Sequence, residues 1–297
     1  MASMAPRTES PWARFRAEFA ESRLAMAGLA LLVVILALGI LAPVISPQNP
    51  YDLAQLDVMD SRLAPGEKSA DGRTYWLGTD DQGRDMLSGI FYGLRISLGV
   101  GVASTVFALA IGLVFGLVAA YFGGWVDTLI MRVVDIQLSF PAILIALILL
   151  AVLGQGVDKI VIALVTVQWA YYARTVRSSA LVERQKEYVE AARVLALRQA
   201  RIVFRHLLPN CLPPLIVVAT VQVAHAIALE ATLSFLGLGL PITEPSLGLL
   251  ISNGFQYLLS GKYWISFYPG VALLLTIMAI NLVADQLRDI LNPRLRK

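Results

Sequence analysis

The side chains that most often carry out catalysis or bind metals are scarce in this sequence. Among its 297 residues are two histidines, His206 and His225, and one cysteine, Cys211. That supply excludes a His-rich metal site and a disulfide within the chain, and the metalloprotease pattern H-E-x-x-H is absent. The phosphate-loop pattern G-x-x-x-x-G-K-[ST] is absent as well, because Tyr263 follows the one Gly-Lys pair. We therefore expect a chain with no catalytic residues, metal or cofactor of its own.

One acidic residue, Glu230, lies inside a long apolar block. A charge at the middle of a bilayer costs about 2.5–3.5 kcal/mol on insertion scales, so such a residue needs a reason. It could line a pathway and meet an amino group of a solute. It could instead lie near a helix end and bond loop amides or an arginine, which Ser234 and Gly237 shortly after it favour. His225 is expected to be a packing histidine, and Cys211 to be structural.

Composition decides the class of protein in which these residues are set. Hydrophobic residues make up 57% of the chain and charged residues 15%, and the mean hydropathy is +0.69. Soluble domains average roughly 45–50% hydrophobic residues and about 25% charged residues. The net charge is only +3. These values exclude a soluble globular domain, a disordered chain and a nucleic-acid-binding module, and they predict a membrane protein.

The apolar residues are gathered in blocks long enough to cross a bilayer as helices. The first, residues 24–45, has no charge and would form a helix roughly 33 Å long. A polar segment precedes it, so an uncleaved membrane anchor is favoured over a signal peptide. We predict an all-α protein with six transmembrane helices, near residues 24–46, 96–122, 136–157, 157–176, 212–233 and 265–283.

The distribution of Lys and Arg orients these helices. With the N-terminus inside, 17 basic residues fall in cytoplasmic segments and 7 in outer segments. Both termini are therefore expected in the cytoplasm. The predicted organisation is a cytoplasmic segment 1–23, a first transmembrane helix 24–46, a periplasmic loop 47–95, a core 96–284 with a cytoplasmic loop at about 174–210, and a cytoplasmic tail 285–297.

Small residues recur every four positions in the second predicted helix: Ala108, Gly112, Gly116 and Ala120. Such a stripe lets another helix backbone approach closely. Packing within the bundle is favoured over an interface with a second subunit.

The expected periplasmic loop is rich in Gly and Asp before the second helix, at residues 76–85. These residues specify turns, and the calcium-loop spacing D-x-[DN]-x-[DN]-G is absent. A structured turn leading into the helix is therefore favoured over a metal site.

The expected cytoplasmic loop contains an amphipathic stretch at 187–210. Apolar residues stand at i, i+3, i+6 and i+7 (Val189, Ala192, Leu195 and Ala196), and Pro209 is expected to end the pattern. Such a helix could lie on the membrane surface or dock into a groove of a cytoplasmic partner.

This loop resembles the signature loop of the inner-membrane subunits of ATP-binding cassette importers. That signature is Glu-Ala-Ala, three residues, Gly, nine residues, a usually apolar position, one residue and Leu-Pro. Glu190, Ala191 and Ala192 match its start, and Leu208 and Pro209 match the final Leu-Pro. Ala196 stands in place of the Gly, and His206 stands in place of the apolar residue.

Four further segments resemble the C-type permease subunit of the dipeptide, oligopeptide and nickel branch: 77–85 (LGTDDQGRD), 121–127 (YFGGWVD), 233–239 (LSFLGLG) and 285–295 (DQLRDILNPRL). The resemblance covers about residues 24–296. It implies a type I ABC importer permease fold in a bacterial inner membrane.

The resemblance also implies partners. They are two cytoplasmic ATP-binding subunits that hydrolyse ATP, a sister permease subunit, and a periplasmic or lipid-anchored solute-binding protein that contacts loop 47–95 and segment 240–262. The solute would be a peptide, with a nickel chelate or glutathione as alternatives. A secondary transporter is the competing class, but it usually carries two repeated halves, and no internal repeat is evident.

The departure at Ala196 gives one backbone expectation. Gly reaches positive φ without steric cost, whereas a residue with a Cβ pays about 1–2 kcal/mol there. We therefore expect Ala196 to keep a negative φ and the loop to be more continuously helical than in the family.

Overall fold

The computed structural model describes residues 11–69 and 71–291, and within these ranges the regular structure is helical apart from two isolated β-bridges near one end of the bundle. The first ten residues of the expected N-terminal segment and the last six of the expected tail lie outside these ranges. The longer helices are α1 (Pro11–Glu21), α2 (Arg23–Ile45), α3 (Met86–Phe122), α4 (Gly124–Ser139), α5 (Ala142–Leu153), α6 (Val157–Glu183), α7 (Glu187–Val194), α9 (Leu208–Phe235), α10 (Leu247–Phe255) and α11 (Trp264–Leu291).

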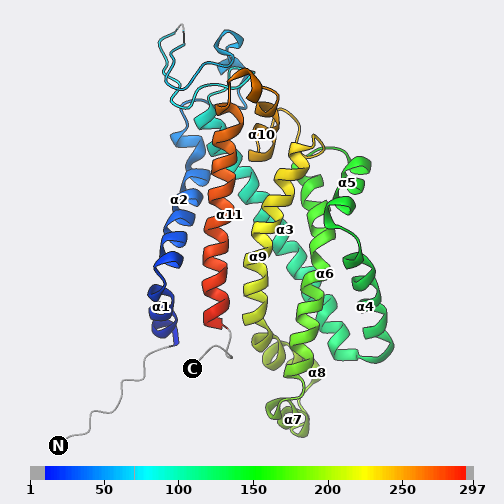
Figure 1. Ribbon diagram of the computed structural model, residues 1–297. Helices are drawn as coiled ribbons and strands as arrows, with labels where there is room; N and C mark the ends of the chain where they lie inside the picture. Colours follow the sequence, from blue (N-terminus) through cyan, green and yellow to red (C-terminus); the bar gives the residue numbers. More distant parts are fainter. Residues whose placement is uncertain (1–10, 70, 292–297) are drawn as a thin grey trace, which may run out of the picture.

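The long helices run side by side as a bundle with two different ends (Figure 1). At one end lies the long connection between α2 and α3, beside α10. At the other end lie α1, the end of α11 and the small helix α7, which projects beyond the bundle. The connection from α6 to α9 passes through α7, the short α8 (Gln199–Arg201) and the wide turn η3 (Ile202–Leu207).

Four helical segments of the described chain are long and apolar enough to cross a membrane: α2, α3, residues 202–235 and α11. The bent pair of α4 and α5 is a fifth candidate. The remaining expected span corresponds to α6, whose 27 residues at about 1.5 Å each give roughly 40 Å. Charged residues at both of its ends, among them Asp158 and Arg177, lower its mean hydropathy.

The third apolar block is not the continuous helix that was expected over 136–157. The chain bends by 91° between α4 and α5. Pro141 lies at the break, and Phe140 before it has an extended backbone with φ −96° and ψ 144°. Proline lacks an N–H and disfavours the helical conformation of the residue that precedes it. The proline therefore interrupts a run that hydrophobicity alone presents as unbroken.

The second apolar helix begins ten residues earlier than expected, at Met86 rather than at 96. Asp85 caps it, because its carboxylate accepts a hydrogen bond from the Ser88 backbone N–H at 2.8 Å. The loop expected over 47–95 is shorter by this extension.

The stripe of small residues on α3 packs against α6, which confirms the expected role in bundle packing. A Cβ on Gly112 would lie 2.4 Å from the Tyr172 Cβ, and one on Gly116 would lie 2.6 Å from the Ala173 carbonyl oxygen. Ala108 and Ala120 are buried in the same cluster. The two backbones therefore lie too close for any larger side chain.

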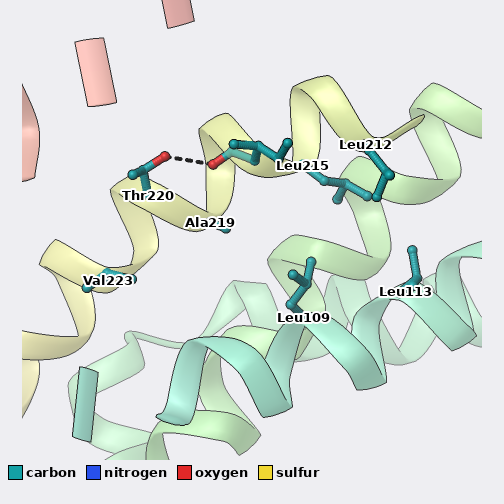
Figure 2. A pocket seen from close by; sticks show the side chains of 8 residues that line it. Leu109, Leu113, Leu212, Leu215, Ala219, Thr220 and Val223 are labelled. Atoms are coloured by element: carbon teal, nitrogen blue, oxygen red, sulfur yellow. Dashed lines mark hydrogen bonds between the residues drawn. The ribbon is translucent and has the colours of Figure 1, made fainter. Parts of the chain in front are cut away.

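An apolar groove of about 310 Å³ lies between part of α3 and part of α9. Figure 2 shows its walls, with Leu109 and Leu113 on α3 facing Leu212, Ala219 and Val223 on α9. The one hydroxyl at its edge, on Thr220, donates to the Ile216 carbonyl oxygen at 2.6 Å. This groove therefore offers a solute no free polar group.

Candidate functional site

The connection from α6 to α9, residues 184–207, holds most of the residues predicted to form a docking site. Helix α7 carries Glu190, Ala191 and Ala192 at the projecting end of the bundle (Figure 1). Leu208 and Pro209 begin α9, where the chain re-enters the bundle. The predicted residues thus occupy the two ends of one connection.

Ala196 departs from the prediction: its φ is +51°, in the left-handed region. The reason is a Schellman cap at the end of α7. The Leu197 N–H donates to the Ala192 carbonyl oxygen at 3.2 Å, and the Ala196 N–H to the Arg193 carbonyl oxygen at 2.9 Å. This pattern requires a left-handed residue at the position of Ala196, which is usually glycine. The expectation of negative φ and greater helical continuity was therefore wrong.

The predicted apolar stripe of this connection is divided between two environments. Val189 and Ala192 are buried beside Ile202. Val194 and Leu195 at the end of α7 are instead 86% and 73% exposed. The stripe therefore fastens the base of α7 to the bundle and leaves an apolar tip uncovered.

Hydrogen bonds fasten the same base. The Tyr188 hydroxyl donates to Glu183 Oε2 at 2.7 Å and accepts from Asn210 Nδ2 at 3.2 Å, so α7 is tied to both α6 and α9. Burial and the neighbouring Glu183 carboxylate raise the pKa of Tyr188 to about 12, so this hydroxyl stays protonated as a donor. Arg184 donates to the Ala120 carbonyl oxygen on α3 at 2.9 Å. Helix α7 is therefore tied by hydrogen bonds to α6 and α9, and Arg184 ties the end of α6 to α3.

Pro209 does not end the helical pattern, contrary to expectation. The chain passes from α8 through the wide turn η3 directly into α9, and Pro209 lies in the first turn of α9. In η3 the hydrogen bonds reach one residue further than in an α-helix, as from the Leu208 N–H to the Val203 carbonyl oxygen. A widened turn gives room for a proline ring where a regular turn would clash.

At the opposite end, the segments 46–69 and 71–85, called the cap below, are held by a buried ion pair. Arg84 Nε lies 2.6 Å from Asp80 Oδ2, and the two side chains are 3% and 0% exposed. The other Asp80 oxygen accepts from the backbone N–H groups of Gln82 and Arg84, each at 2.9 Å. Arg84 Nη1 also donates to the Ile242 carbonyl oxygen at 3.1 Å. The expected structured turn before the second helix is confirmed, and its Asp80, Arg84 and Asp85 side chains are buried.

Two further carboxylates of the cap are shifted by their surroundings. Burial raises the pKa of Asp85, and hydrogen bonds from Ser88 offset part of this effect. Burial and the adjacent Asp80 carboxylate raise the pKa of Asp81. Gly83, with φ +76°, is required at the turn, because a Cβ there would lie 2.1 Å from the Asp57 carbonyl oxygen.

Glu230 is completely buried in α9, close to the helix end at Phe235. Its two carboxylate oxygens accept hydrogen bonds from the hydroxyls of Ser97 and Ser234, each at 2.8 Å. The position near a helix end is as expected, but the partners found are serines rather than loop amides or an arginine. In this conformation the carboxylate has no surface that a solute could touch.

His225 is not the packing histidine that was expected. Its ring lies on an exposed position of α9, with Nδ1 3.0 Å from Gln222 Oε1. A signal in the sequence could have revealed this site: polar residues stand midway along two apolar helices, Gln168 on α6 and Gln222 with His225 on α9.

Comparisons with known proteins agree with this architecture. Residues 112–297 match the family model of the binding-protein-dependent transport system inner membrane component, and residues 10–65 match the N-terminal TM domain of oligopeptide transport permease C. The dipeptide transport system permease protein DppC of Alkalihalophilus pseudofirmus is 35% identical, over 97% of this chain and 91% of the relative. The oligopeptide transport system permease protein OppC of Bacillus subtilis is 36% identical, over the same shares of the two chains.

A solved structure shares the fold. The chain resembles one from the inward-facing MetNI methionine ABC transporter with a TM-score of 0.56 and 23% sequence identity, over 69% of this chain and 97% of the other. At that identity the likeness concerns the fold alone. The family model, however, matches more than half of the chain, and both relatives match nearly all of it. The chain belongs to the family of binding-protein-dependent transport system inner membrane components, the membrane subunits of ABC importers.

Proposed function

We propose that this chain forms one half of the transmembrane pathway of an ATP-driven peptide importer. The relatives named for dipeptide and oligopeptide transport support the peptide cargo. A sister permease subunit supplies the other half, and a periplasmic or lipid-anchored binding protein delivers the solute to the cap. A nickel chelate or glutathione is the alternative cargo, since the resemblance extends to importers of such solutes.

The projecting tip of α7 is the observation that carries the coupling role. Val194 and Leu195 are exposed beyond the bundle, while hydrogen bonds fix the base of α7 to α6 and α9. A firmly held helix with an uncovered apolar tip suits a groove on a partner protein. In this proposal the partner is an ATP-binding subunit, which contacts the exposed residues Glu190, Ala191 and Ala196. Ala192, also predicted to contact this subunit, is buried and instead packs the base of α7 against the bundle. The rigid-body closure of the ATP-binding subunit on ATP moves α6 and α9 through this contact.

The same proposal orients the molecule. The α7 end, with both termini, faces the cytoplasm, and the cap faces the periplasm. The bias of 17 basic residues over 7 supports this orientation. ATP hydrolysis then belongs to the partner subunits, which agrees with the missing phosphate loop.

Reversal of the charge at Glu190 tests the contact. Glu190 is exposed on α7, so Glu190→Lys should leave the unfolding temperature of the chain unchanged. We expect the ATP-binding subunits to co-purify less with this variant, and ATP-dependent uptake to fall at least tenfold. Glu21→Lys is the matched control, because Glu21 is an exposed glutamate of α1 at the same end of the bundle.

Two results would contradict the proposal. Wild-type co-purification and uptake in Glu190→Lys would remove Glu190 from the contact. Uptake that continues without any ATP-binding subunit would favour a secondary transporter instead.

A further inference from the structure

A second cavity of the bundle differs from the apolar groove between α3 and α9. It has a volume of about 380 Å³ and lies between α5, α6 and α9. Its walls carry three nitrogen-containing side chains, Gln168, Gln222 and His225. The other lining residues are the hydroxyl-bearing Tyr171 and Thr232 and four apolar residues, and the Thr232 hydroxyl donates to the Ala228 carbonyl oxygen at 2.8 Å. The cavity contains no Asp, Glu, Lys or Arg in its lining.

These three side chains lie halfway along their helices. Gln168 is the twelfth of the 27 residues of α6, and Gln222 and His225 are the fifteenth and eighteenth of the 28 residues of α9. Polar side chains at this depth are costly beside lipid, and they usually face the bundle interior or a water-filled cavity. Because His225 is exposed on the surface of this chain, either water or another molecule must cover it in the membrane.

Gln168 indicates which kind of molecule covers this site. Its side chain lines the cavity but is only 3% exposed, and its Oε1 is buried with no hydrogen-bond partner in the described chain. This oxygen therefore meets a solute only when the side chain turns toward the cavity. A buried acceptor without a partner destabilises a fold, so its presence indicates a donor that arrives from outside. A helix of a sister subunit satisfies its backbone N–H groups internally and has few left to donate. A short peptide carries free N–H and C=O groups along its whole length.

We propose that Gln168, Gln222 and His225 form a contact site for the main-chain amides of the solute halfway through the membrane. This inference rests on the proposed peptide import and adds a place and a chemistry to it. A lining without Asp, Glu, Lys or Arg binds amide groups rather than the charged ends of a peptide. Peptides of different sequence share those amides, so the site tolerates variation in their side chains.

Accessibility of a cysteine at position 225 tests whether the cavity is wet. The complete importer, with its sister, ATP-binding and solute-binding subunits, is reconstituted in proteoliposomes on a Cys211→Ala background. We expect His225→Cys to react with a membrane-impermeant cationic methanethiosulfonate in the nucleotide-free or the ATP-bound state. Leu274→Cys is the control, since Leu274 is an apolar residue of α11 that is 63% exposed. Protection of His225→Cys in both states would show that lipid or the sister subunit covers the cavity, and would overturn the proposal.

Removal of the Gln168 amide tests the contact itself, with tritiated dialanine as the probe. Gln168→Leu should raise the KM for uptake about tenfold, the loss expected for one hydrogen bond. It should leave the unfolding temperature unchanged or higher, because the amide has no partner in the empty chain. A purely structural glutamine would give the opposite pair of results. Thr220→Val in the apolar groove is the control and should leave KM unchanged.

The outcomes separate this inference from the proposed function. Normal dialanine KM in Gln168→Leu, with wild-type uptake intact, overturns the amide contact alone. Failure of the wild-type importer to take up dialanine contradicts peptide import and with it the amide contact. In that case the labelling of His225→Cys still decides whether the cavity is part of a water-lined pathway.

Discussion

The cap and the α6–α9 connection both join membrane helices, but their ion pairs lie in opposite environments. In the cap, Asp80 and Arg84 are buried and bonded to each other and to the backbone. In the connection, the ion pair of Lys186 and Glu183 is partly solvated, with Lys186 52% exposed. Both regions carry exposed apolar residues: Val58, Met59 and Trp76 in the cap, and Val194 and Leu195 in the connection. The cap is therefore held by a buried charge pair, whereas the charge pair of the connection is partly solvated.

The largest expected effect comes from breaking the buried pair of the cap. Arg84→Leu leaves the Asp80 carboxylate buried without its partner, which should lower the free energy of unfolding by about 3–5 kcal/mol. Lys186→Met is the matched change in the connection and should cost less than about 1 kcal/mol, because solvent screens that pair. Denaturant unfolding of the purified chain in detergent measures both. Equal losses in the two variants would abolish the contrast between the two ends.

A smaller effect is expected where the connection stores strain. Ala196→Gly removes the steric cost of a left-handed alanine and should stabilise the end of α7 by about 1 kcal/mol. Ala191→Gly, in the interior of the same helix, should instead destabilise it by about 0.5–1 kcal/mol. Hydrogen exchange of the α7 amides would compare the two variants. A loss of protection in both would show that position 196 is not strained.

The smallest effect is a pH dependence of the cap. Burial raises the folded pKa of Asp85 above the unfolded value, so the folded state holds this proton more tightly. The contribution of Asp85 to stability therefore falls as pH rises from about 4 through the raised pKa. Asp85→Asn keeps an oxygen for the helix cap and should flatten this slope, as measured by unfolding temperature against pH. An unchanged slope would assign it to Asp81, whose pKa is also raised.

The sequence-based prediction succeeded where a property depends on spacing along one helix. The apolar blocks and the small-residue stripe of α3 follow from periodicity and composition, while Glu190 was singled out by the resemblance to the importer signature loop. Pro141 was also visible, but its apolar neighbours concealed the 91° break. The hydrophobicity of a segment indicates that it is buried in protein or lipid but not the direction of its helix axis, so it could not predict the bend between α4 and α5.

The prediction failed where a conformation depends on partners distant in sequence or on the hydrogen bonds that end a helix. The sign of φ at Ala196 follows from two backbone hydrogen bonds that no residue type announces. Glu230 finds Ser97 on another helix, 133 residues away. The turn that contains Asp80 and Arg84 was predicted, but the bond from Arg84 to the Ile242 carbonyl oxygen, 158 residues away, was not. Such partners emerge only when the bundle is assembled.

The close contact of α3 with α6 has a mechanical consequence. Helix α3 has 37 residues, which at about 1.5 Å each makes a rod of roughly 55 Å from the cap to the other end of the bundle. Because glycine lets it touch the α6 backbone and Arg184 ties its far end, the two helices can act as one stiff lever. A tilt of about 5° would displace the end of such a rod by about 5 Å. A small displacement of α7 can thus move the cap by several ångströms, about 5 Å for a tilt of about 5°.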